Sequence, residues 1–373
     1  MNFVTHSKQI YRIFKHIYLK FGIVKRDFAH RFFVFYFDIF IYPRCKSFEF
    51  QNNVLFFILP KHYGNKFKDS AVGIYQIVDP LRQFLKEHNN EVVIHLWFPD
   101  ENSKACDVLK FLKQIHILGP QKIIIDSPQY RSARFKDFGT EIYCYIQEKY
   151  DVDLIEIGWD TLSEKWWQEI ELSNLDRTVL ILDNPQKKFV PQSLCDNNKA
   201  LVMVPPFSLS QIFQAANHRN LDYNFIGSVG SYRDYRNDYL DFISNLGYKS
   251  LLADFKSRKD QLARTDFLEV LNKSKISINF SMTHSQNFQL KGRVWEVMLA
   301  GSMLLEQDNE QIKYFFTEGT HFVSFADKFQ LKDNLLHYIN NDSERIKIAE
   351  AGQKRAIELI QSNDFLKFIT NLT

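Results

Sequence analysis

From residue 54 onward, short apolar runs of strand length alternate with longer stretches of helical character. Repeated alternation of this kind is typical of a parallel sheet with helices on both faces. The predicted strands form two series. The first comprises residues 54–59, 91–98, 122–125, 152–157 and 179–182, and the second comprises residues 223–226, 249–253, 276–280, 303–305 and 321–325. We therefore predict an α/β chain with two doubly wound, Rossmann-like domains.

The predicted helices lie between these strands. They cover residues 72–87, 103–118, 234–246 and 293–299, and two further helices end the chain. A chain of 373 residues also exceeds what one hydrophobic core usually serves. Residues 184–206 contain four prolines and are the best candidate for the connection between domains.

These boundaries predict four segments. They are an N-terminal extension at 1–50, an N-terminal domain at 51–205, a C-terminal domain at 206–358, and a last helix at 359–373 that can cross back to the first domain.

The charge and cysteine content narrow the class of protein. The formal net charge is +3, which is too small for a protein that coats nucleic acid. Four cysteines without a CxxC pair suit a reducing compartment and indicate neither a zinc site nor a disulfide framework. No signal peptide is recognisable, and the longest apolar run is too short to span a bilayer. We expect a cytoplasmic protein without nucleic-acid partners.

Ligands of open parallel sheets bind beyond the carboxyl ends of the strands. The strand at 223–226 is followed by Gly227 and Ser228, and then by Arg233 and Arg236. Glycines let backbone amides approach a phosphate, and arginine offers a bidentate donor. A tight turn with solvated arginines is the alternative. The motif is not a P-loop, because Gly-Lys-Ser/Thr is absent.

A second candidate site follows the strand at 276–280. Lys291 and Arg293 stand where the next helix begins, although the positive end of the helix dipole disfavours cations there. Their presence suggests that a ligand brings an anion to this helix start. Glu296, one turn on, can accept two vicinal ribose hydroxyls. An internal pair between Glu296 and one of the two cations is the alternative.

Three segments in this half carry a family resemblance. Residues 291–306 (KGRVWEVMLAGSMLLE), 314–327 and 343–355 resemble, in this order, the donor domain of group 1 glycosyltransferases. The closest likeness is to the spore-maturation-protein-B-like branch, and it covers roughly residues 222–358.

The resemblance implies the GT-B fold, in which two Rossmann-like domains face a central cleft. It also implies that Glu296 contacts the nucleotide ribose, that Lys291 and Arg293 face the diphosphate, and that the anomeric configuration is retained. Many group 1 enzymes carry another glutamate eight positions earlier, where this chain has Phe288. The identity of the sugar therefore stays open.

The N-terminal domain is expected to hold the acceptor. His62 and Gly64 lie in the loop after the first strand, where Gly64 can bring amides to the donor phosphate. Asp126 and Asp183 end strands and can touch an acceptor hydroxyl or stabilise charge, although a strand-end carboxylate is more often a helix cap. His284 is a further loop residue. Asp126 and His62 are the predicted catalytic residues.

No metal ligand set and no cofactor are predicted. The strand-end loops lack an Asp-x-Asp pattern, and Asp151-Val-Asp153 opens a strand at the wrong end. Arg233, Lys291 and Arg293 can neutralise a leaving diphosphate instead.

The first fifty residues are basic and aromatic, with nine Lys/Arg against three acidic residues. Ile10, Phe14, Ile17 and Phe21 have helical spacing, with cations on other faces. Such a helix can lie on a membrane surface near a lipid-linked acceptor, or it can cover the N-terminal domain.

The sequence thus predicts a metal-independent glycosyltransferase that uses a nucleotide sugar as co-substrate and a glycan or lipid-linked acceptor. A catalytically silent sugar-nucleotide or glycan-binding module and a GT-B-shaped epimerase are the alternatives.

Overall fold

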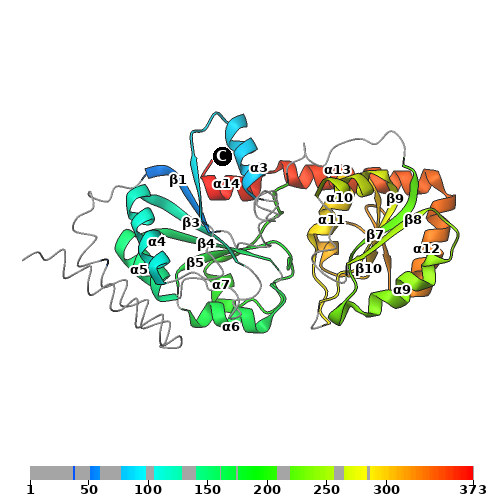
Figure 1. The fold of residues 1–373 in the computed structure, drawn as a ribbon, viewed down its shortest axis with the longest axis horizontal. Helices are drawn as coiled ribbons and strands as arrows, with labels where there is room; N and C mark the ends of the chain where they lie inside the picture. The colour runs from blue at the N-terminus through cyan, green and yellow to red at the C-terminus, as the bar shows by residue number, and fades with distance from the viewer. Residues whose placement is uncertain are drawn as a thin grey trace, which may run out of the picture.

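The computed structural model describes residue 37 and residues 51–58, 77–97, 105–127, 140–159, 161–173, 175–207, 219–255, 264–283 and 286–372. Its described elements form two α/β domains that lie side by side (Figure 1). Each domain contains one parallel sheet, as the alternating apolar pattern predicts.

The N-terminal sheet has six strands in the order β2-β1-β3-β4-β5-β6. Their bounds are β1 (Gln51–Ile58), β2 (Val93–Trp97), β3 (Pro120–Ser127), β4 (Asp153–Gly158), β5 (Arg177–Ile181) and β6 (Ala200–Val202). The helices of this part are α3 (Asp79–Glu87), α4 (Ala105–Leu118), α5 (Thr140–Tyr150), α6 (Glu164–Leu172) and α7 (Gln192–Asp196). All of the strand pairs are parallel.

The C-terminal sheet has five strands in the order β11-β10-β9-β7-β8. Their bounds are β7 (Leu221–Ser228), β8 (Ser250–Phe255), β9 (Ser274–Asn279), β10 (Met303–Gln307) and β11 (Val323–Phe325). The helical elements are η4 (Ser231–Arg233), α9 (Tyr235–Ser244), α10 (Arg264–Lys273), α11 (Gly292–Leu299), η6 (Ile312–Tyr314), α12 (Lys328–Asn340), α13 (Asp342–Gln361) and α14 (Asp364–Thr370).

Each sheet is buried on both faces, which explains why its strands are almost continuously apolar. In the N-terminal domain, Phe56 and Ile58 pack with α4 and α5, while Leu55 and Phe57 pack with α3 on the other face. In the C-terminal domain, two further cores cover the two faces in the same way.

The last helix belongs to the opposite domain. Phe365, Leu366 and Ile369 of α14 are buried in the core that contains α3, so the chain crosses back after α13 (Figure 1). Lys122 of β3 donates from Nζ to the carbonyls of Phe368 and Ile369 at 3.1 and 3.3 Å.

Two expectations about chain organisation were wrong. Three helices rather than two end the chain, because Asn363 takes a left-handed backbone conformation (φ 55°) and separates α13 from α14. Residues 184–202 belong to the N-terminal domain rather than to a connection, since β6 pairs in parallel with β5. The connection therefore lies between β6 and β7.

Two glycines of the predicted donor segments have structural roles. Gly301 ends α11 with φ +67°, a conformation that side chains disfavour. Gly352 of α13 lies so close to the turn before β11 that an added Cβ would approach the carbonyl oxygen of His321 to 2.5 Å.

Candidate active site

The candidate donor site is built from strand ends of the C-terminal sheet. β7 ends at Ser228, β9 at Asn279 and β10 at Gln307, and α11 begins at Gly292. Because these strands are parallel, their carboxyl ends share one edge of the sheet. The sequence-predicted residues Gly227, Ser228, Lys291, Arg293 and Glu296 all belong to these strand ends or to the helix start.

Arg293 joins the start of α11 to the end of β7. Its Nη1 donates to the carbonyl oxygen of Ile226 at 2.6 Å, and its Nε donates to Oε2 of Glu296 at 3.2 Å. The guanidinium also lies 4.3 Å from the ring centroid of Phe267. The pair between Arg293 and Glu296 is therefore formed, as the alternative interpretation of these residues expected, and the Glu296 side chain is only 7% exposed.

Lys291 occupies the N-cap position of α11. Its backbone is extended (φ −93°, ψ 147°), and its side chain does not cap the helix. No acidic residue stands in the first turn of α11. The positive end of the helix dipole and a cation therefore coincide at this point, an arrangement that favours an anion.

The two arginines after β7 have different environments. Arg233 lies in η4, with its guanidinium 4.2 Å from the ring centroid of Tyr232. Arg236 is buried, and it donates to the carbonyls of Ser228 and Phe280 at 2.9 and 3.0 Å. Arg236 therefore has a structural role and is not a phosphate ligand.

Gly227 itself is packed tightly, because an added Cβ would meet the Phe225 ring at 2.8 Å.

A further buried carboxyl group, which the sequence did not indicate as a site residue, lies at the strand-end edge of the C-terminal sheet. Glu306, near the end of β10, is fully buried and accepts hydrogen bonds from Asn279 Nδ2 (2.7 Å) and from the Ser281 hydroxyl. Burial raises the pKa of Glu306 to about 8, although hydrogen bonds and the charge of Lys291 lower it. An acidic residue that ends an apolar strand was the signal that could have revealed it.

Asp126 lies at the corresponding edge of the N-terminal sheet, near the end of β3. It is 6% exposed and accepts a hydrogen bond from Trp159 Nε1 at 2.9 Å. Burial raises the pKa of Asp126 to about 7, opposed by that hydrogen bond. Near neutral pH, Asp126 can thus exchange a proton, which suits a group that contacts an acceptor hydroxyl.

Asp183 has a different environment from that of Asp126. Its two carboxylate oxygens accept from the backbone N–H and the hydroxyl of Thr161, both at 2.8 Å. Its backbone carbonyl accepts from the N–H of Leu290 at 3.0 Å, across the domain boundary. Asp183 therefore anchors the loop after β5 rather than presenting a free carboxylate.

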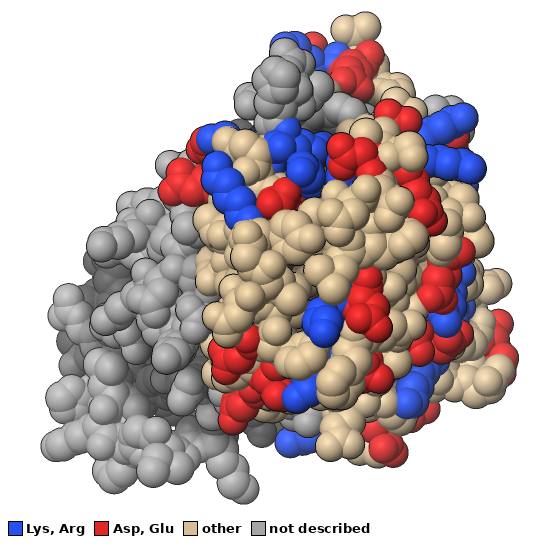
Figure 2. Space-filling model, turned by 90° about the vertical axis from the view of Figure 1, so that its right-hand side faces the viewer, with Lys and Arg blue, Asp and Glu red and all other residues tan. Residues whose placement is uncertain are grey.

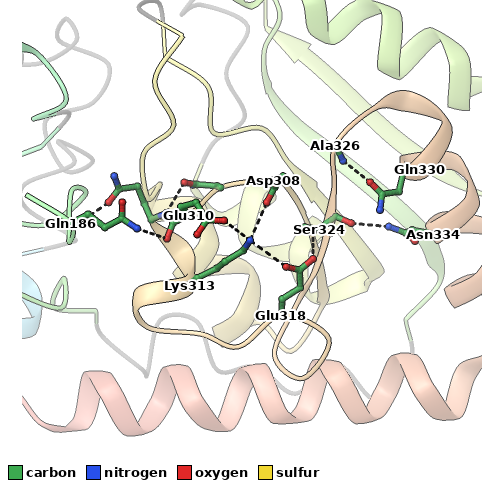
Figure 3. A network of polar contacts seen from close by, with 11 residues as sticks. Gln186, Asp308, Glu310, Lys313, Glu318, Ser324, Ala326, Gln330 and Asn334 are labelled. Carbon is green, nitrogen blue, oxygen red and sulfur yellow. Dashed lines mark hydrogen bonds and ion pairs between the residues drawn. The ribbon is translucent and has the colours of Figure 1, made fainter. Parts of the chain in front are cut away.

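The loop after β5 makes further contacts with the C-terminal domain. Gln186 donates from its backbone N–H to Gln311 Oε1 (3.2 Å) and from its side chain to the carbonyl of Glu310 (3.1 Å). Lys188 donates to Asn287 Oδ1. Figure 3 shows Gln186 beside the loop that carries Asp308, Glu310 and Lys313. The strand-end loops of the two domains therefore meet.

Some predicted residues cannot be placed. His62, Gly64 and His284 lie outside the described residues, as do residues 1–50 apart from Phe37. Phe288, which replaces the glutamate of many group 1 enzymes, forms an antiparallel bridge with Met282.

Within the described residues, neither a metal-binding cluster nor a membrane-spanning helix is found. There, no group of three or more His, Cys, Asp or Glu side chains is arranged to hold a metal ion. None of the helices in those ranges combines the length and apolar character that a membrane span requires.

One face of the C-terminal domain is visible in Figure 2. On its described surface, basic and acidic side chains are both scattered around a broad area of uncharged residues.

The sequence of this chain matches one family model. Residues 209–365 match a family model described as glycosyl transferase-like. No curated protein sequence matches the chain.

Several solved structures share its fold. Sucrose-phosphate synthase from Thermosynechococcus elongatus is 9% identical with a TM-score of 0.60, covering 86% of this chain and 98% of that chain. HepE from Anabaena in complex with UDP-glucose is 10% identical with a TM-score of 0.56, covering 85% and 98%. BGT of T4 phage in complex with UDP and Mn²⁺ is 12% identical with a TM-score of 0.51, covering 86% and 99%.

The described strands and helices explain this likeness, since two parallel sheets covered by helices place strand-end loops of both domains against each other. The chain therefore has the GT-B fold, and its C-terminal half matches the glycosyl transferase-like family.

Proposed function

We propose that this protein transfers a sugar from a nucleotide diphosphate donor to a glycan or lipid-linked acceptor. The observation that carries the proposal is the start of α11, where Lys291, the helix dipole and the buried Glu296 stand at the strand-end edge. A cationic helix start beside a carboxylate suits a diphosphate that is joined to a ribose.

The donor binds across this edge. The diphosphate lies against Lys291 and the backbone at Gly227 and Ser228, with Arg233 as a further cation, and Glu296 exchanges part of its pairing with Arg293 for the ribose hydroxyls. A uridine nucleotide is the first choice of donor, since the GT-B neighbours HepE and BGT are complexes with UDP-glucose or UDP. Assignment to the spore-maturation-protein-B-like branch stays a prediction from the sequence.

The reaction breaks the bond between the anomeric carbon and the leaving diphosphate oxygen, and the acceptor oxygen forms the new bond. In a retaining transfer, the leaving diphosphate takes the acceptor proton. Asp126 holds the acceptor hydroxyl, and His62 is its proposed partner on the acceptor side. Lys291, Arg293 and Arg233 neutralise the leaving group without a metal ion.

The test measures the fate of the sugar. Incubation with UDP-glucose and an acceptor glycan is expected to release UDP and to yield a product in which NMR shows the retained α configuration. Equal rates with EDTA and with Mn²⁺ support metal independence. Inversion in the product contradicts retention, and a rate that collapses in EDTA contradicts metal independence.

A catalytically silent binding module is the second candidate, because the Arg293–Glu296 pair occupies the carboxylate of the proposed ribose site. This candidate predicts saturable binding of the sugar nucleotide without release of UDP. An epimerase predicts a changed sugar that stays on the nucleotide.

Residues 1–50 are proposed to bring the enzyme to an anionic membrane surface, on the basis of their charge. Sedimentation with phosphatidylserine vesicles is expected to carry down the full chain and to leave a chain without residues 1–50 in solution. Equal sedimentation of both contradicts the proposal.

A further inference from the structure

Glu306 is the centre of a buried polar cluster behind the helix start. Asn279 and Ser281 reach it from the end of β9, and Asn309 reaches it from the loop after β10. All four side chains are at most 7% exposed. Ser281 and Asn309 also belong to the two loops that flank the proposed donor site.

Hydrogen bonds extend from this cluster to the domain boundary. Asn309 donates to the carbonyl of Gln289 at 3.0 Å and accepts from the N–H of Gln311 at 3.0 Å. Gln311 in turn accepts from Gln186 of the N-terminal domain. Glu306 thus stabilises the loop that ends in Lys291 and the loop that contacts the other domain.

Among the described residues, the charged and titratable groups that act on this carboxyl group or lie near it come from the start of α11 and from α9. Lys291, at the start of α11, lies close enough for its charge to favour the ionised form. Among the described residues, Tyr235 of α9 also interacts electrostatically with Glu306, and its hydroxyl donates to Gln307 Oε1 at 3.1 Å. The neighbouring Arg236 is held by the carbonyls of Ser228 and Phe280.

We propose that Glu306 is a positioning residue that takes up a proton when the anionic diphosphate of the donor binds beside Lys291. This inference rests on the proposed function, because it requires the donor at the start of α11. In the empty site, the charge of Lys291 favours the ionised form of Glu306. A bound diphosphate pairs with Lys291 and brings its own negative charge near a fully buried carboxyl group, which favours the neutral acid.

The neutral acid keeps the cluster intact. A protonated carboxyl group can donate to the Ser281 hydroxyl while its other oxygen still accepts from Asn279. Donor binding and protonation then favour each other, as linkage requires. Burial raises the pKa of Glu306 to about 8 in the empty site, so the coupling falls within an accessible pH range.

The experiment is calorimetric titration of the full chain with UDP-glucose, at each pH in two buffers that hold that pH and differ in ionisation enthalpy, such as HEPES and Tris at pH 8. UDP-glucose is suitable because its diphosphate does not titrate between pH 6 and 9. We expect uptake of about 0.5 proton per donor bound at pH 8 and close to none at pH 6. The affinity is expected to weaken by up to roughly tenfold between pH 6 and 9.

Two variants identify the group that takes up the proton. Glu306→Gln imitates the neutral acid, so its affinity should vary little with pH and its proton uptake should vanish. Asp126→Asn removes the other buried carboxyl group with a raised pKa among the described residues, and uptake at pH 8 should persist.

Each outcome has one meaning. Binding of UDP-glucose without proton uptake, or uptake that survives in Glu306→Gln, overturns the role of Glu306 and leaves the proposed function standing. No binding of UDP-glucose at either pH contradicts the uridine donor of the proposed function, and the inference for that donor then falls with it.

Discussion

At the residue scale, two buried carboxyl groups have raised pKa values. Asp126 and Glu306 end strands in different domains, and burial raises the pKa of both, to about 7 and about 8. Their surroundings differ, because Trp159 donates to Asp126 whereas several neutral donors and the charge of Lys291 act on Glu306. The first is suited to contact an acceptor, and the second to support a loop.

Asp126 gives a testable dependence of stability on pH. Its raised pKa means that the folded state keeps a proton that the unfolded state loses. Its stabilising contribution is therefore complete below about pH 4 and is lost as the pH rises to 7. Between these limits, Asp126 lowers the free energy of unfolding by about 1.4 kcal/mol per pH unit. Urea denaturation at several pH values should show a flatter profile for Asp126→Asn.

The control for this experiment is Asp241→Asn, which changes an exposed aspartate on α9. Its profile should follow that of the wild type. A profile of Asp126→Asn parallel to the wild type would show that Asp126 is ionised in the folded state and would remove the basis for its proposed role.

At the scale of elements, a buried ion pair joins β4 to β5. Glu156 of β4 and Arg177 of β5 form a pair at 2.5 Å in which both side chains are at most 1% exposed. Glu156→Ala should lower the free energy of unfolding by about 3–5 kcal/mol, because it leaves the guanidinium buried without its counter-charge.

The double variant Glu156→Leu/Arg177→Met provides the comparison in the same urea experiment. It should recover most of the loss, since an apolar pair leaves no unpaired charge. A double variant less stable than Glu156→Ala would contradict this account of the pair.

The attachment of α14 depends on Lys122. Its ammonium donates to the carbonyls of Phe368 and Ile369 and to Asn371 Oδ1 (2.6 Å) at the end of that helix. Lys122→Met should lower the free energy of unfolding by about 2 kcal/mol, because buried acceptors lose a charged donor. Hydrogen exchange should also become faster in α14. Lys113→Met, at an exposed position of α4, is the control, and unchanged exchange in α14 would contradict the proposed attachment.

The element pattern could be predicted from the sequence because both sheets are buried on two faces. Strands such as β4 and β10 are mostly apolar, and the helices between the strands have a different period. The break at Asn363 could not be predicted, since neither glycine nor proline marks it. Likewise, β6 has only three residues and pairs at an edge that only the tertiary structure provides.

Site residues could be predicted from the sequence only where they are neighbours along the chain. The positions of Lys291, Arg293 and Glu296 follow from the start of one helix. The bond from Arg293 to the carbonyl of Ile226 joins residues 67 positions apart, so no local pattern indicates it. The buried hydrogen bonds of Arg236 and the convergence of Asn279 and Ser281 on Glu306 depend on tertiary packing in the same way.

On the scale of the whole molecule, two chain connections join the domains. One lies between β6 and β7 and the other between α13 and α14, and residues 204–207, 359–360 and 362–366 line a common hollow. On the strand-end side, the loop after β5 contacts the C-terminal domain through Asp183 and Gln186. A change in the angle between the domains must therefore rearrange these contacts, which lie beside the proposed donor site.

The central claim is that the donor binds at the start of α11. The most direct measurement is calorimetric titration of UDP-glucose into the wild type, Glu296→Ala and Glu350→Ala, where Glu350 is an exposed glutamate on α13. We expect saturable binding to the wild type and to Glu350→Ala, and an affinity at least tenfold weaker for Glu296→Ala. Equal affinity of all three proteins would contradict the account.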